Sequence, residues 1–152
     1  MSEPVLIRKA DSKDIDHLIN LENKCFDAHQ FGKQQFKYYL NQNNCICYLV
    51  YNKDIFGYIL GIIDHRGKKK KARLYSLAVL PGFRKKGYAS MLLREFENEV
   101  VKSGTSVITL EVSNKNKNAL KLYVDTSYQF DKVIKDYYGK NKPALRMHKF
   151  LK

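Results

Sequence analysis

The chain has 152 residues, 44% of them hydrophobic, which suits one domain with a substantial buried core. Its formal net charge of +13 predicts attraction to polyanions such as nucleic acid, ribosomes, acidic proteins or a multiply charged cofactor. No apolar run is long enough for a transmembrane helix, and the first residues lack a basic segment followed by an apolar stretch, so we expect a cytoplasmic protein without membrane attachment or secretory signal.

The N-terminal part of the chain predicts one strand and two helices. The strand is expected over Val5–Lys9. Asp11 and Ser12 offer N-cap oxygens to a helix over Ser12–Cys25, whose apolar residues recur at helical spacing. A second, shorter helix is expected over Lys33–Leu40.

Three strands forming an antiparallel meander are expected next, over Ile46–Tyr51, Ile55–Asp64 and Arg73–Val79. Cys45 and Cys47 share one face of the first strand and do not form a sterically easy pair. With Cys25 they are interpreted as reduced thiols, and too few Cys or His residues lie near them to predict a metal site.

The densest run of positive charge, Lys68–Arg73, lies between the second and third strands of this meander. We interpret it as a solvated hairpin tip, because runs of like charge are usually solvated. An electrostatic docking patch for the ribosome is the alternative interpretation.

The C-terminal half predicts alternating helices and strands. A long helix is expected over Gly87–Lys102, with Met91, Leu92, Phe96 and Val100 on its inner side and Gly104 at its end. A strand over Val107–Val112, a helix over Asn116–Asp125 and strands over Lys132–Asp136 and Ala144–Phe150 follow. This order of elements predicts an α/β domain with a mixed sheet.

The segment Arg84–Ser90 joins a strand to the long helix and has the composition of a phosphate-binding loop. The free N–H groups at a helix start bind anions, and small residues such as Gly87 and Ala89 let the backbone approach a pyrophosphate. The segment matches neither the P-loop nor the G-x-G-x-x-G signature. A basic loop with a glycine for a tight turn is the simpler alternative.

Arg-x-x-Gly-x-Ala after the strand Leu77-Ala78-Val79 resembles motif A of the GNAT acetyltransferases. The resemblance implies an acetyl-CoA cofactor whose pantetheine arm contacts the backbone of that strand. It implies that the pyrophosphate is held by the loop residues Arg84, Lys85, Lys86, Gly87, Tyr88, Ala89 and Ser90. It also implies a single domain over residues 1–152, with a mixed, mostly antiparallel sheet of about six to seven strands and about four helices.

A second block, Glu111 to Tyr123, resembles the corresponding hallmark of the bacterial ribosomal-protein N-terminal acetyltransferases. By that resemblance Glu111 is the general base, Asn116 contacts the pantetheine arm, and the Tyr123 hydroxyl serves the leaving thiolate. The chemistry is coherent in itself, since an ammonium must lose a proton before it attacks a thioester. A backbone N–H near Val79 or Leu80 is expected to stabilise the oxyanion.

A third block places Tyr137 and Tyr138 before the last strand, where the same subgroup holds the first residues of its peptide substrate. Tyr138 is the main candidate for peptide contact and Tyr137 the second, with His29 and Phe31 as candidates on the opposite wall. The chain departs from the family in three places, one of which is the absence after Phe26 of the Pro-Trp that is common in ribosomal-protein acetylases. Ser127 stands where a glycine is usual, and Lys140 and Lys142 make the last loop basic.

These features predict acetyl transfer from acetyl-CoA to a primary amine, most directly the α-amine or a lysine of a protein or peptide. Acetylation of a small amine, such as an antibiotic, an amino sugar or a polyamine, is the first alternative. A basic module that binds RNA or the ribosome without catalysis is the second alternative, and salt-sensitive affinity would distinguish it.

Overall fold

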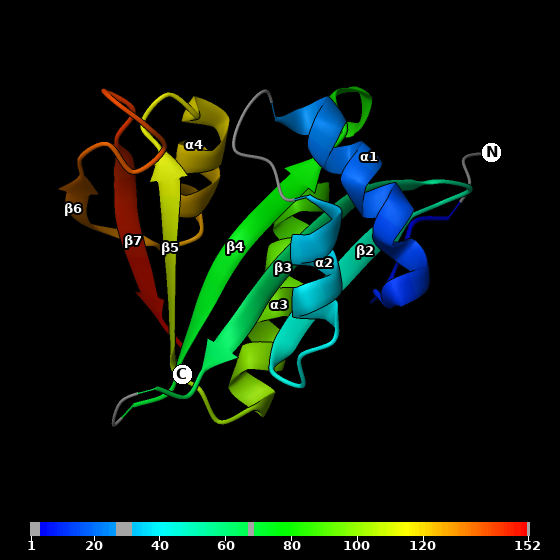
Figure 1. Ribbon diagram of the computed structural model, residues 1–152, viewed down its shortest axis with the longest axis horizontal. Helices are drawn as coiled ribbons and strands as arrows, with labels where there is room; N and C mark the ends of the chain where they lie inside the picture. Colours follow the sequence, from blue (N-terminus) through cyan, green and yellow to red (C-terminus); the bar gives the residue numbers. More distant parts are fainter. Residues whose placement is uncertain (1–3, 27–31, 67–68, 152) are drawn as a thin grey trace.

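The computed structural model describes residues 4–26, 32–66 and 69–151, which form an α/β domain around one seven-stranded sheet (Figure 1). The strands are β1 (Leu6–Lys9), β2 (Cys45–Tyr51), β3 (Ile55–Asp64), β4 (Lys71–Val79), β5 (Val107–Ser113), β6 (Gln129–Ile134) and β7 (Ala144–Phe150). The helices are α1 (Ile15–Cys25), α2 (Lys33–Leu40), α3 (Tyr88–Lys102) and α4 (Lys117–Asp125), with short 3₁₀ turns at Ser12–Asp14 and Pro81–Phe83.

The sheet is mixed and mostly antiparallel, as predicted. Its strand order is β1-β2-β3-β4-β5-β7-β6, and β4 with β5 forms the parallel pair among six neighbouring pairs of described strands. In Figure 1, α1 and α2 lie in front of the β2–β4 half of the sheet and α3 lies behind it, so this half is buried on both faces.

The sheet divides between β4 and β5. The two strands pair over Ala72–Leu74 and Ile108–Leu110, three residues of each, and then diverge toward their C-terminal ends (Figure 1). A register shift between β3 and β4 at Leu60/Gly61 lies at the same level of the sheet. Beyond this level β4 and β5 no longer hydrogen-bond to each other. The backbone N–H and C=O groups on their facing edges are therefore left unpaired within the sheet.

Helix α3 packs closely against the β3 side of this split. A Cβ placed on Gly61 would lie 2.5 Å from Cζ of Phe96 and 2.5 Å from the carbonyl oxygen of Arg73. Glycine is therefore needed at position 61 for the helix to reach the sheet. The predicted inner face of α3 is correct for Leu92, Phe96 and Val100 but wrong for Met91, which is 39% exposed. Leu93 is buried in its place, because it continues the stripe of positions 92, 96 and 100 around the helix.

Two of the predicted strands are misplaced by two or more residues at one end or both. The strand expected over Lys132–Asp136 is β6, Gln129–Ile134, and Asp136 instead occupies a turn at φ +55°. As an edge strand with exposed side chains, β6 needs no alternation of apolar residues, so the sequence carries little signal for its position. β4 begins at Lys71 rather than Arg73, because Ala72 is fully buried and pairs with Ile63. Arg73 thus lies in the sheet and not in the solvated hairpin tip.

Candidate active site and cofactor groove

The start of α3 forms an anion-binding surface. Gly87 is the N-cap at φ +85°, and the first helical bond runs from the N–H of Met91 to the carbonyl of Gly87. The N–H groups of Tyr88, Ala89 and Ser90 therefore have no partner within the helix and carry the positive end of its dipole. A Cβ on Gly87 would meet no atom within 4 Å, so the space beside Gly87 at the start of the helix is open.

A groove of about 620 Å³ runs from these amides along the end of β4 to α4. It is lined by most of the residues predicted to bind the cofactor: Leu77, Ala78, Val79, Arg84, Lys85, Gly87, Tyr88, Ala89, Ser90, Asn116 and Tyr123. Lys86 is not among the lining residues. The groove thus brings together segments far apart in the sequence.

The backbone of β4 faces the groove at Val79. The N–H of Leu80 donates to the carbonyl of Phe56 at 2.8 Å, so the predicted use of the Leu80 amide for an oxyanion is wrong. Ladder bonds alternate along an antiparallel pair, so the backbone groups of Val79, which pairs with Gly57, point toward β5. The carbonyl of Val79 accepts from Nε of Arg84 at 2.8 Å, and this leaves its N–H as the amide facing the split.

A second hollow, of about 440 Å³, lies where β4 and β5 diverge, and we call it the acceptor cleft. Its lining includes Leu74–Leu77 of β4, Leu110–Ser113 of β5, Glu22 of α1, and Tyr138 and Lys142 of the loop before β7. The acceptor cleft and the groove share five lining residues, namely Phe26, Leu77, Asn116, Ala119 and Tyr123. The two hollows therefore meet at the sheet's split.

Glu111 lies in the acceptor cleft with its side chain 6% exposed. Its Oε1 accepts from a terminal nitrogen of Arg73 at 2.6 Å and from one of Arg146 at 3.1 Å. None of the described residues donates a hydrogen bond to Oε2 of Glu111. The carboxylate is thus fixed through one oxygen and offers the other to a ligand.

Tyr123 lies at the junction of the two hollows. Burial, with a smaller contribution from Tyr138, raises the pKa of Tyr123 above its ordinary range, so its hydroxyl stays protonated at neutral pH. Asn116 caps α4, accepting from the N–H of Ala119 at 3.2 Å, and also lines both hollows. Capping and ligand contact are compatible for this side chain.

The paired tyrosines of the last loop differ in position. Tyr138 lines the acceptor cleft, and its hydroxyl donates to the Glu111 carbonyl at 3.3 Å, whereas Tyr137 lies beside Arg73, outside the lining. Burial, Tyr137 and Glu111 raise the pKa of Tyr138 to about 12. His29 and Phe31 lie outside the described residues, so their predicted contacts stay predictions.

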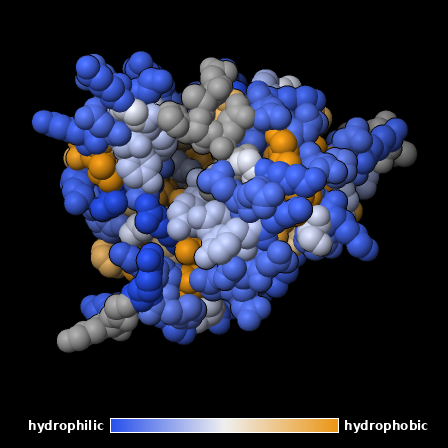
Figure 2. Space-filling view, in the orientation of Figure 1, coloured by the Kyte–Doolittle hydropathy of each residue, from blue (hydrophilic) through white to orange (hydrophobic). Residues whose placement is uncertain are grey.

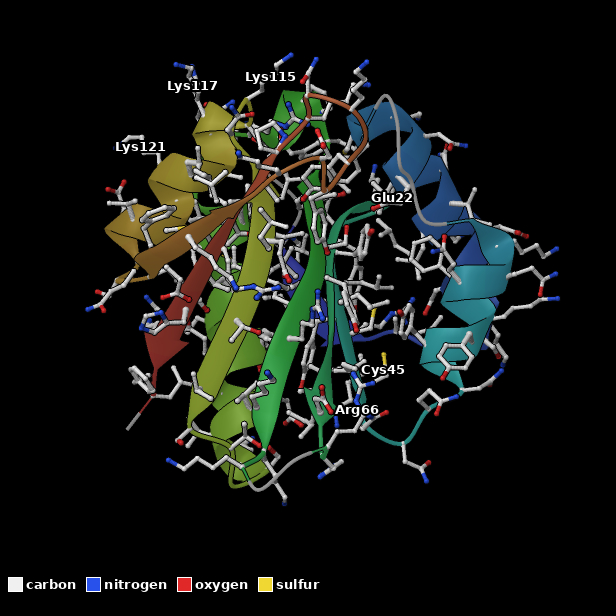
Figure 3. All side chains as sticks on the ribbon, turned by 60° about the vertical axis from the view of Figure 1, so that its left-hand side comes forward. Glu22, Cys45, Arg66, Lys115, Lys117 and Lys121 are labelled. Carbon is white, nitrogen blue, oxygen red and sulfur yellow. The ribbon has the colours of Figure 1, made fainter. Side chains whose placement is uncertain are left out.

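Glu22 is a cleft residue that the sequence pattern did not single out. It is 2% exposed and projects from α1 toward the sheet (Figure 3). Its Oε1 accepts from the hydroxyl of Tyr58 and from that of Ser76 at 2.8 Å. A glutamate at an apolar position of the α1 stripe, where Leu18 and Leu21 are also buried, is the signal that points to it.

The described residues contain no cluster of three or more metal-ligating side chains. The described helices include none that is both long and apolar enough to cross a membrane.

Comparison with known proteins identifies a family. The model of the "Acetyltransferase (GNAT) family" matches residues 15–126. An N-acetyltransferase from Methanocaldococcus jannaschii is 28% identical over 95% of this chain and 91% of its own length. The homologue of the ARD1 subunit of an N-terminal acetyltransferase complex from Dictyostelium discoideum is 32% identical over 65% of this chain. That alignment spans about half, 49%, of the Dictyostelium protein.

Solved structures share the fold over nearly the whole chain. The ribosomal-protein-S18-alanine N-acetyltransferase from Escherichia coli superposes with a TM-score of 0.86 at 18% identity, covering 97% of this chain and 94% of its own. Arabidopsis thaliana NAA60 in complex with acetyl-CoA gives a TM-score of 0.85 at 16% identity, covering 97% and 98%. At these identities the likeness concerns the fold.

Proposed function

Because this chain belongs to the GNAT family of acetyltransferases, we propose that it transfers an acetyl group from acetyl-CoA to the α-amine, or a lysine, of a protein or peptide. The amine attacks directly while both substrates are bound. The observation that carries the proposal is the junction of the groove and the acceptor cleft at Tyr123, since transfer without a covalent enzyme intermediate requires the two reactants to meet.

The groove fits acetyl-CoA. Its free amides at the start of α3, the open space before Gly87 and the cations Arg84 and Lys85 suit a pyrophosphate. The backbone of Leu77 and Val79, on the side of β4 that faces the split, suits the amides of a pantetheine arm, and Asn116 lies at the same place. The bound cofactor supplies an acetyl group activated as a thioester.

Glu111 is the proposed general base. Its Oε2 accepts the proton of the acceptor ammonium, directly or through a water, while Arg73 and Arg146 hold the carboxylate in place through Oε1. The N–H of Val79 is the proposed donor to the oxyanion. Tyr123, which its burial keeps protonated, donates its hydroxyl proton to the leaving thiolate at the cofactor end of the junction.

Support for a protein or peptide acceptor comes from two relatives, the ARD1 homologue of an N-terminal acetyltransferase complex and the ribosomal protein bS18-alanine N-acetyltransferase of Haemophilus ducreyi. Tyr138, and Tyr137 behind it, are the proposed peptide contacts in the loop before β7. A net charge of +13 disfavours polycationic small amines. The same charge suits an acceptor presented near ribosomal RNA, and co-sedimentation with ribosomes at low and high salt would test that association.

The test compares Tyr123→Phe with the wild-type protein. Removal of the hydroxyl is expected to lower kcat for a peptide acceptor by about 10- to 1,000-fold with little change in the KM for acetyl-CoA, because the lost proton donor acts on the leaving group. Tyr128→Phe is the matched control. Tyr128 is a buried tyrosine whose ring contacts Tyr123 but which lines neither hollow, so this variant should keep its kcat.

Thermal unfolding with acetyl-CoA provides an independent readout of the cofactor. Acetyl-CoA should stabilise the wild-type protein and Tyr123→Phe alike, in a concentration-dependent manner that unrelated nucleotides do not reproduce. Absence of any stabilisation at saturating acetyl-CoA would contradict the proposed reaction. Equal kcat values for Tyr123→Phe and Tyr128→Phe would contradict only the proposed role of Tyr123, and not the proposed reaction.

A further inference from the structure

Two arginines that lie outside the lining of the acceptor cleft hold Glu111, which is one of its lining carboxylates. Arg73 and Arg146 both direct a terminal nitrogen to one oxygen of one carboxylate, Glu111. Two guanidinium groups against one carboxylate leave an excess of one positive charge. Neither arginine forms the two-bond pair that guanidinium and carboxylate favour, and Nε of Arg73 is buried with no hydrogen-bond partner among the described residues.

Both arginines remain open to a ligand. Their side chains are 28% and 34% exposed, whereas that of Glu111 is 6% exposed. Guanidinium carries five N–H donors. Arg73 also contacts the Tyr137 hydroxyl at 3.4 Å, and donor capacity is left on both arginines. A second carboxylate arriving beside the cleft, next to Glu111, would satisfy the exposed guanidinium donors that Glu111 does not.

The rim of the cleft is also cationic. Lys142, in the loop before β7, and Lys115, before α4, line it, and Lys115 lies near Lys117 at the start of α4 (Figure 3). Asp136, the acidic residue of the β6–β7 loop, accepts from the N–H of Asn141 at 2.8 Å and so serves the turn itself. Figure 2 shows that the face presented in Figure 1 is mostly hydrophilic, with apolar atoms in small separate patches, as suits a polar ligand.

The sign of charge thus changes along the cleft. Its lining carboxylates, Glu22 and Glu111, suit the cationic α-amine of a peptide. The arginines beside Glu111 and the lysines at the rim suit negative groups that follow. Successive residues of an extended peptide lie about 3.5 Å apart, so side chains near the N-terminus come within reach of the long arginine side chains.

We propose that the acceptor is a protein or peptide N-terminus with an acidic side chain within its first three residues, and that Arg73 and Arg146 select that carboxylate. This inference rests on the proposed acetylation of a protein or peptide α-amine. The basic Lys142, together with Lys115, adds attraction at longer range, which is weakened by salt.

The experiment measures kcat/KM for peptides that differ in one residue. A single Glu, Gln or Lys is placed at position 1, 2 or 3 of an otherwise neutral peptide with a free α-amine. The Glu peptide is expected to exceed its Gln counterpart by about tenfold at one of these positions, and the Lys peptide to be poorest, because a charge-assisted bond with arginine is lost or reversed.

Arg146→Gln should bring the ratio of kcat/KM between the Glu and Gln peptides close to one. Because Arg146 also holds Glu111, kcat is expected to fall for both peptides, so the ratio and not the absolute rate is the readout. Lys142→Gln, on the exposed loop before β7, should reduce the ratio without affecting folding. Lys13→Gln is the charge-matched control, since Lys13 is exposed at the start of the chain away from the cleft. Its preference should equal that of the wild-type protein.

Equal kcat/KM for the Glu and Gln peptides at all three positions would overturn the inference while leaving peptide acetylation intact. A preference that survives in both Arg146→Gln and Lys142→Gln would overturn the assignment to this cleft. Failure to acetylate any peptide, with acetyl-CoA still bound, would overturn the proposed acceptor and this inference with it.

Discussion

The three thiols lie at different depths and report on different parts of the molecule. Cys47 is buried and Cys45 partly buried in β2, whereas Cys25 lines the groove at the end of α1. Burial raises the pKa of Cys47 far above its ordinary range and that of Cys45 to about 11. At pH 8 a thiol with that pKa is about 0.1% thiolate, so its alkylation is slow.

We therefore predict that iodoacetamide at pH 8 modifies Cys25 first. Burial raises the pKa of Cys25 as well, but Arg84 opposes the shift, and the thiol adjoins the groove. Acetyl-CoA should slow this modification by occupying the groove. Mass spectrometry of timed samples measures it, with Cys45 and Cys47 as internal controls that acetyl-CoA leaves unchanged. Modification of Cys25 at the same rate with saturating acetyl-CoA would contradict the location of the cofactor.

Residues within local motifs were predictable from sequence, and residues that depend on long-range packing were not. Glu111, Asn116 and Tyr123 lie within one strand-to-helix segment, so their spacing alone indicates a common site. Glu22, by contrast, accepts a hydrogen bond from Ser76, which lies 54 positions away in the sequence. Arg73 was expected where the basic run meets the next strand, and no role in the site was predicted for it, because nothing local indicates that Glu111, 38 positions later, lies beside it.

At the scale of elements, α3 and α4 end on the same hydrogen-bond motif with different residues. After α3, the N–H of Thr105 donates to the Val100 carbonyl and Gly104 lies at φ +83°. After α4, the N–H of Tyr128 donates to the Tyr123 carbonyl and Ser127 lies at φ +77°. Both are Schellman motifs, in which the left-handed position favours glycine. Ser127 is the departure from the family pattern noted in the sequence, and it stores strain in this turn.

Ser127→Gly is therefore expected to raise the free energy of unfolding by about 0.5–1 kcal/mol, the relief of left-handed strain less the entropy that glycine adds to the unfolded chain. Urea unfolding at pH 7 measures the change. Ser127→Ala keeps the strain and should give no gain. A destabilised glycine variant would show that the Ser127 side chain contributes more than its backbone costs.

Element order was predictable throughout because each buried helix and central strand carries its own hydrophobic period. The boundaries that failed lie where burial on one face is weak. β6 is exposed along an edge, and the start of β4 is set by Ala72, a single small residue inside a run of lysines. No local sequence pattern indicates the split between β4 and β5, because it depends on two strands that α3 separates in the sequence.

At the scale of the whole molecule, the net charge of +13 is expected to draw the polyanionic cofactor toward the groove. The KM for acetyl-CoA should therefore rise about 3- to 10-fold between 50 and 300 mM NaCl, while kcat stays nearly constant, because salt screens the attraction and not the chemistry within the cleft. Steady-state kinetics with a neutral peptide measure this. A KM insensitive to salt would show that local contacts, not the overall field, govern binding.

The division of the sheet also bears on self-association. A sheet interrupted in its middle has four edges instead of two, and unpaired edges are where chains of neighbouring molecules add and aggregate. The outer edges are blunted, since β1 has four residues and β6 contains an irregularity at Phe130/Lys132 next to an exposed lysine. The inner edges at β4 and β5 lie within the acceptor cleft, whose lining also includes Glu22 and Phe26 at the end of α1 and Tyr138 and Lys142 in the loop before β7. Because these side chains flank the unpaired backbone, we expect the inner edges to be less accessible to the sheet of a neighbouring molecule than an open outer edge.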